Sequence, residues 1–154
     1  EQLERRLNNI LRVGNIVEVD YDNALCRVEI GNIKTAWLKW FTDRASNDRS
    51  WWAPEVGEQV MVLSPSGEMA QGSVLPAIYQ DAHPAPADRE TVHRTEYADG
   101  STVEYDRDAH RLLANLGASA IDMDRSRILL RSNGSTLEMD SAGIRLNGSR
   151  IDLN

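Results

Sequence analysis

The sequence is poor in cysteine, in basic residues and in long apolar runs. A single cysteine, Cys26, among 154 residues excludes a scaffold held by intrachain disulfides. Lysine and arginine number 17 against 24 acidic residues, and the net charge of -7 argues against binding to a nucleic-acid backbone. No apolar run approaches the roughly 20 residues of a membrane-spanning helix. The chain is also too short for a barrel enzyme of eight β/α units.

Aromatic residues are scarce beyond residue 80. All four tryptophans and the only phenylalanine lie between Trp37 and Trp52, whereas the chain beyond residue 80 has only Tyr97 and Tyr105. A single mixed core would not separate its aromatic residues in this way. The distribution predicts two different kinds of structure joined in one chain.

The first part of the chain is predicted to be a short helix followed by a small barrel. Within residues 1–11, Leu3, Leu7, Ile10 and Leu11 recur at the spacing of one helix face.

From residue 12 the period changes to two, and about five short strands separated by turns fit into residues 12–80. This pattern is typical of a five-stranded Greek-key barrel of the OB type. Residues 81–95 are rich in proline and poor in apolar side chains, which predicts a linker. The fold class is therefore all-β apart from the first helix.

Residues 96–154 contain an internal repeat of short strands. Segment 99–106 aligns with segment 133–140 at an offset of 34 residues. An apolar, acidic, apolar, acidic-or-amide pattern recurs at starts 18, 16 and 14 residues apart, in segments 103–106, 121–124, 137–140 and 151–154. This alternation gives each strand one apolar and one charged face.

Such a tail has too few apolar side chains per strand to form a closed core alone. We therefore predict three copies wound about a common axis as an intertwined, triple-stranded β-helix, or β-prism, in a homotrimer. A single-chain β-solenoid is the alternative. The acidic residues and Arg125, Arg127, Arg131, Arg145 and Arg150 are predicted to face solvent. The side chains predicted to point into the trimer core are Val103, Tyr105, Ile121, Met123, Ile128, Leu130, Leu137, Met139, Ile144, Leu146, Ile151 and Leu153.

The segment from Trp52 to Gly72, WAPEVGEQVMVLSPSGEMAQG, resembles the barrel of phage baseplate assembly protein V. That family forms the central tail spike of contractile phages and of phage-tail-like, pyocin-like bacteriocins, and it is similar to type VI secretion spike proteins. The resemblance implies a structural protein rather than an enzyme. Its OB domains would dock on the tail hub and other baseplate proteins, and its β-helix would puncture the bacterial outer membrane when the sheath contracts. The implied location is the baseplate of a virion or phage-tail-like particle, assembled in the bacterial cytoplasm and then released.

The chain departs from the family pattern at the tip. Family members often end in a His-x-His motif that holds an iron ion in the trimer, and no such motif occurs here. The resemblance therefore implies iron only if a His-x-His segment lies beyond Asn154 or in a separate tip protein. No metal site is predicted within this chain.

The tryptophan cluster is the candidate contact surface. Trp37, Trp40, Trp51 and Trp52 are predicted to contact the hub or a neighbouring subunit. The alternative is a stacking platform of an OB-fold module that binds an oligosaccharide or single-stranded nucleic acid, trimerised by the β-tail. The negative charge speaks against nucleic acid.

No catalytic residues are predicted. His83, His93 and His110 lack the close spacing of zinc ligands, and Cys26 fits a buried apolar position. The tail's carboxylates follow the strand period, which explains them without a glycosidase pair.

Overall fold

The computed structural model describes residues 1–153, which form two compact units. The first unit is Glu1–Pro84, and the second begins at Ala85. Among the described residues, no helix is long and apolar enough to cross a membrane. The first strand of the second unit begins at Val92, inside the range 81–95 for which the sequence predicts a linker.

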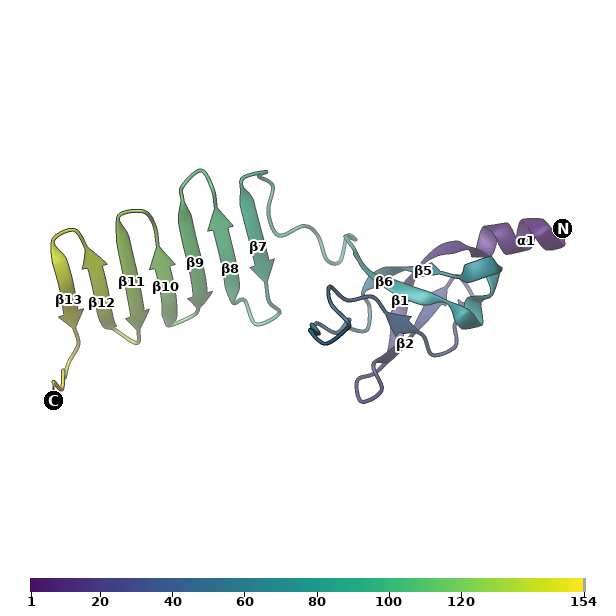
Figure 1. Ribbon diagram of the computed structural model, residues 1–154, viewed down its shortest axis with the longest axis horizontal. Helices are drawn as coiled ribbons and strands as arrows, with labels where there is room; N and C mark the ends of the chain where they lie inside the picture. The colour runs from purple at the N-terminus through teal and green to yellow at the C-terminus, as the bar shows by residue number, and fades with distance from the viewer. Residues whose placement is uncertain (154) are drawn as a thin grey trace. The chain divides into compact units, whose positions relative to one another are not determined.

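The first unit is a helix followed by a small β-barrel (Figure 1). Helix α1 spans Gln2–Asn9, slightly shorter than the range 1–11 expected from the sequence. The strands are β1 (Leu11–Asp20), β2 (Leu25–Ile30), β3 (Ile33–Lys34), β4 (Lys39–Trp40), β5 (Gln59–Leu63) and β6 (Ser73–Ile78). Two 3₁₀ turns, η1 (Pro65–Gly67) and η2 (Met69–Gln71), connect β5 to β6.

The strands of this unit lie in the order β3-β2-β1-β5-β6-β4. All pairs are antiparallel except β4 with β6, which is parallel. An isolated bridge joins Cys26 of β2, the neighbour of the edge strand β3, to Leu38, which lies next to the opposite edge strand β4. Its two backbone hydrogen bonds are 2.9 and 2.8 Å long. The sheet thereby closes on itself, as the OB-type prediction requires.

The barrel core is made of inward-facing aliphatic side chains. β2 shows the alternation expected from its sequence, with Cys26, Val28 and Ile30 buried and their neighbours more exposed. The remaining buried core residues are Ile16, Leu38, Val60, Val62 and Val74. The tryptophans are not among these buried core residues.

Residues 33–41 do not form one continuous strand. They divide into β3 and β4, and Thr35 lies between them, 2% exposed. The Thr35 hydroxyl accepts a hydrogen bond from the Val28 N–H at 3.0 Å, and its carbonyl accepts one from Arg27 Nε at 2.8 Å. The Thr35 hydroxyl thus replaces a backbone carbonyl as the acceptor for the Val28 N–H. The regular strand pairing is interrupted at this residue.

Helix α1 lies against the 3₁₀ turn η1. A Cβ atom added to Gly67 would lie 2.4 Å from the Arg6 carbonyl oxygen, and Gly67 has a φ of +75°. Both the close approach and the left-handed backbone require glycine.

The second unit is a single antiparallel sheet in which every strand pairs with its neighbours in sequence (Figure 1). Its strands are β7 (Val92–Glu96), β8 (Thr102–Asp106), β9 (Arg111–Leu116), β10 (Ser119–Met123), β11 (Arg127–Ser132), β12 (Ser135–Asp140) and β13 (Gly143–Asn147).

Aspartates at the strand ends shape the connecting turns. The Asp106, Asp124 and Asp140 carboxylates each accept a hydrogen bond from the backbone N–H two residues later, at 3.0, 2.7 and 2.8 Å. Such side chains mimic a backbone turn. At the opposite strand ends, Asn133 and Gly134 have φ of 48° and 88°, as the Asn-Gly pair predicts for a tight hairpin.

Candidate functional site

The second unit has one face that is apolar over six consecutive strands, β8 to β13. We call this surface the apolar face. Cross-strand pairing aligns its side chains in two rows. The first row is Thr95, Val103, Ala114, Ile121, Leu130, Leu137 and Leu146; the second is His93, Tyr105, Leu112, Met123, Ile128, Met139 and Ile144.

Ten of the twelve side chains predicted for a trimer core lie in these two rows. The other two, Ile151 and Leu153, lie after β13 and outside any strand. The predicted set did not include Leu112 and Ala114 of β9, a strand whose leucines fall on both faces of the sheet.

The apolar face is exposed in the single chain. Its side chains from Val103, Tyr105, Ile121, Leu130, Ile144 and Leu146 have exposed fractions between 38% and 69%. The described part of this unit contains one sheet and no helix, so nothing within the unit covers them. An apolar surface of this extent is typical of an interaction site.

The opposite face carries a ladder of ion pairs. Arg111 donates two hydrogen bonds to Asp122, at 2.8 and 2.7 Å. Arg127 lies 3.5 Å from Asp122 and 3.9 Å from Glu138. Arg145 pairs with both Glu138 and Asp140, and Arg94 pairs with Glu104. We call this surface the charged face.

The expectation that the tail's acidic residues face solvent is wrong for two of them. Asp122 and Asp106 are only 6% and 8% exposed, since neighbouring side chains and turn backbone cover them. The hydrogen bonds from Arg111 lower the pKa of Asp122 and outweigh the effect of burial. Arg145 likewise lowers the pKa of Asp140. These carboxylates stay ionised and structurally paired.

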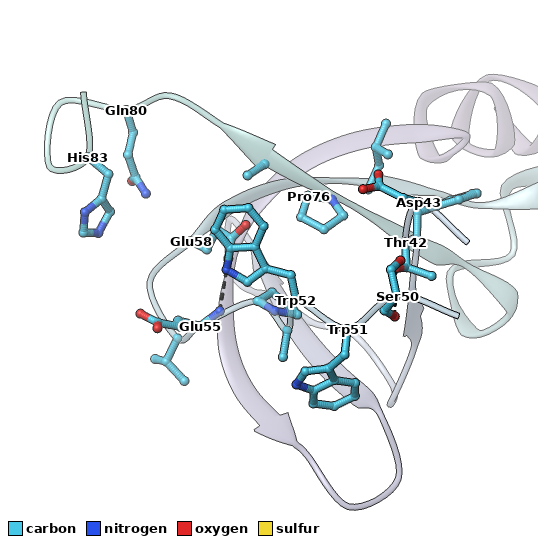
Figure 2. A pocket seen from close by; sticks show the side chains of 16 residues that line it. Thr42, Asp43, Ser50, Trp51, Trp52, Glu55, Glu58, Pro76, Gln80 and His83 are labelled. Atoms are coloured by element: carbon cyan, nitrogen blue, oxygen red, sulfur yellow. Dashed lines mark hydrogen bonds between the residues drawn. The ribbon is translucent and has the colours of Figure 1, made fainter. Parts of the chain in front are cut away.

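The first unit carries a groove of about 700 Å³. We call it the tryptophan groove. Its exposed apolar side chains are Phe41, Trp51, Trp52, Val56 and Leu75. Figure 2 shows both indoles at its centre, with Asp43 on one side and Glu55 on the other.

The four tryptophans do not form one platform. Trp51 is 63% and Trp52 72% exposed, and both line the groove. Trp40 packs against the barrel core and meets Trp51 edge-on, with ring centroids 5.8 Å apart. Trp37 is not a lining residue; the Arg27 guanidinium lies 5.7 Å from the centroid of its ring. The contact between Trp40 and Trp51 fixes the position of the groove's first indole.

Several polar groups of the groove already have partners. The Thr42 and Ser50 hydroxyls lie 2.6 Å apart, and Glu58 accepts a hydrogen bond from the Glu55 N–H at 3.0 Å. Gln80 donates to the Gly57 carbonyl at 2.8 Å and accepts from Asn15 at 3.3 Å.

Metal-binding and nucleophilic groups are not assembled in the described residues. No group of three or more His, Cys, Asp or Glu side chains there is suited to hold a metal ion. Burial raises the pKa of the Cys26 thiol to about 11, so this core residue is not a reactive thiolate.

Comparison with known proteins supports the resemblance drawn from residues 52–72. Residues 12–79 match the family of the type VI secretion system/phage-baseplate injector OB domain. The chain is 41% identical over 112 residues to the spike protein of Escherichia phage P2, a match that covers 73% of this chain and 53% of the relative.

The chain thus spans about half the length of the curated relative that it matches. The similarity confirms the predicted resemblance to the baseplate spike family and the OB fold of the first unit. It also supports the predicted location in a virion baseplate.

Proposed function

Because residues 12–79 belong to the injector OB family of type VI secretion systems and phage baseplates, we propose that this chain is one protomer of a trimeric central spike. The second units of three chains form its shaft, and the first units form its base. The shaft punctures the bacterial outer membrane when a contractile sheath drives it forward.

The observation that carries the proposal is the apolar face. It is continuous over six strands, while the charged face behind it carries ion pairs that join residues of β9 to β13. Burying each large apolar side chain contributes on the order of 1.5–3 kcal/mol. Three copies that turn this face toward a common axis bury it and leave the charged face in water.

The strand dimensions suit a three-walled β-prism. Strands of five or six residues are about 17–20 Å long. A triangular prism with walls of that width places each wall about 5–6 Å from the axis, close to half the ~10 Å spacing of stacked sheets. Its interior has room for aliphatic side chains and for Tyr105, and little for more aromatic residues.

The OB units supply the docking surfaces toward the tail hub and other baseplate proteins. In this proposal Trp37, Trp51 and Trp52 are contact residues, and Trp40 supports Trp51 from the core side. A separate tip protein covers the far end of the shaft. No catalytic step is required, because the shaft transmits force.

The groove favours a second candidate function, an OB module that binds an oligosaccharide. Exposed indole rings stack on sugars, and the volume of about 700 Å³ lies within the range of ligand sites. This candidate predicts saturable glycan binding that is lost in Trp51→Ala.

Light scattering on the full chain tests the spike proposal. We expect a particle of three times the 17.3 kDa chain mass, unchanged over a hundredfold range of protein concentration. A monomer of 17.3 kDa at every concentration would refute it.

A further inference from the structure

We propose that the tryptophan groove binds an arginine side chain presented by another baseplate protein. This inference deepens the docking role proposed above and rests on it. The groove then selects its partner by charge and by stacking, rather than by apolar area alone.

The charge of the groove selects a cationic partner. Asp43, Glu55 and Glu58 line it, whereas its only basic side chain is His83. Among the described residues, the Asp43 and Glu55 carboxylates have neither an ion pair nor a hydrogen bond. Both groups are therefore available to accept hydrogen bonds from a ligand.

The remaining polar groups argue against a sugar. An oligosaccharide needs several donors and acceptors around its hydroxyls. Here the hydroxyls of Thr42 and Ser50 bond to each other, and both ends of the Gln80 amide are engaged within the barrel. The groove also offers an indole surface flanked by the Asp43 and Glu55 carboxylates, one on each side.

A guanidinium fits that combination. It is planar, it stacks on the face of an indole, and it donates to carboxylates through its edge. Trp51 is held by Trp40, so little ordering is needed when a ligand arrives. Tryptophan and arginine are also enriched among the residues that dominate protein–protein interfaces.

Tryptophan fluorescence titration tests the inference on the full chain. The probe is the blocked peptide acetyl-Gly-Arg-Gly-Arg-Gly-amide, and its matched control is the same peptide with citrulline in place of arginine. We expect saturable binding of the arginine peptide and at least tenfold weaker binding of the citrulline peptide. Equal binding of both, or no saturation by 10 mM peptide (about 3 kcal/mol of binding free energy), overturns the inference.

Two charge-matched variants separate the groove from the overall charge. Asp43→Asn with Glu55→Gln is expected to weaken binding at least tenfold. Asp22→Asn with Glu29→Gln removes the same charge from exposed sites outside the groove and is expected to change binding less than twofold. Equal weakening in the two variants means non-specific attraction and overturns the inference.

Three further outcomes distinguish this inference from a glycan site and from the spike proposal. Quenching by chitotetraose but not by the arginine peptide assigns the groove to a glycan and overturns the inference. A trimer that does not bind the arginine peptide leaves the spike proposal intact and overturns only the inference. A monomer that binds it refutes the spike proposal while the recognition chemistry stands.

Discussion

At the scale of single residues, Asp122 is a carboxylate of the charged face that two arginines contact. It is 6% exposed, accepts two hydrogen bonds from Arg111 and lies near Arg127. Asp122→Asn removes the charge that both arginines face. Hydrogen bonds to charged groups contribute about 1.5–3 kcal/mol each, so we expect the second unit to lose stability of that order. Urea denaturation measures it, with Asp88→Asn as the exposed control.

The same pairing makes the second unit sensitive to acid. The pKa of Asp122 is lowered first by hydrogen bonds from Arg111, and that of Asp124 by those from Ser126. A carboxyl group with a lowered folded-state pKa stabilises the fold above its unfolded value of about 3.9. That contribution disappears as pH falls through the folded-state pKa. We expect the melting temperature to drop below about pH 4, and to drop less in Asp122→Asn. A melting temperature constant from pH 7 to pH 2 would contradict this.

At the scale of elements, Met123 tests the assignment of the two faces. It lies in the second row of the apolar face, between Leu112 and Ile128. Met123→Asp brings three carboxylates to the proposed axis, and we expect loss of the trimer in light scattering. Thr136→Asp adds the same charge on the charged face opposite Arg131 and should leave the trimer intact. A stable Met123→Asp trimer would show that this face is not the interface.

The contact between helix α1 and η1 is tested by a pair of glycines. Gly67 and Gly31 both have positive φ, but only Gly67 has a neighbour, the Arg6 backbone, within reach of an added Cβ. Alanine costs roughly 1–2 kcal/mol at either position because of the backbone conformation. We expect Gly67→Ala to cost more and to speed trypsin cleavage at Arg5 and Arg6. Equal cleavage rates in Gly67→Ala and Gly31→Ala would contradict this.

Elements with strong alternation could be predicted from sequence, and those without it could not. β12 was found because Leu137 and Met139 alternate with acidic residues. β9 was missed because its leucines fall on both faces, Leu112 on the apolar face and Leu113 on the charged one. The tryptophan groove was predicted only in part. The indoles were identified, but the placement of Asp43 and Glu55 on either side of them depends on loop conformation that alternation does not encode.

At the scale of the whole molecule, the division into two compact units predicts two unfolding events. Scanning calorimetry is expected to show two transitions. Only the transition of the second unit should move to higher temperature with protein concentration, because trimer formation couples its stability to association. One transition, independent of concentration, would contradict both the division into units and the proposed trimer.

The strictly sequential strand order of the second unit also bears on how the protein is made. Every ladder in this sheet joins strands that are adjacent along the chain, so its contact order is low. Each hairpin can form as soon as it leaves the ribosome, before any partner is present. The nascent protomer then displays its apolar face from β8 onward. Association is thus favoured by synthesis from one messenger, where sister chains emerge close together, and slow translation of the tail would favour capture by chaperones.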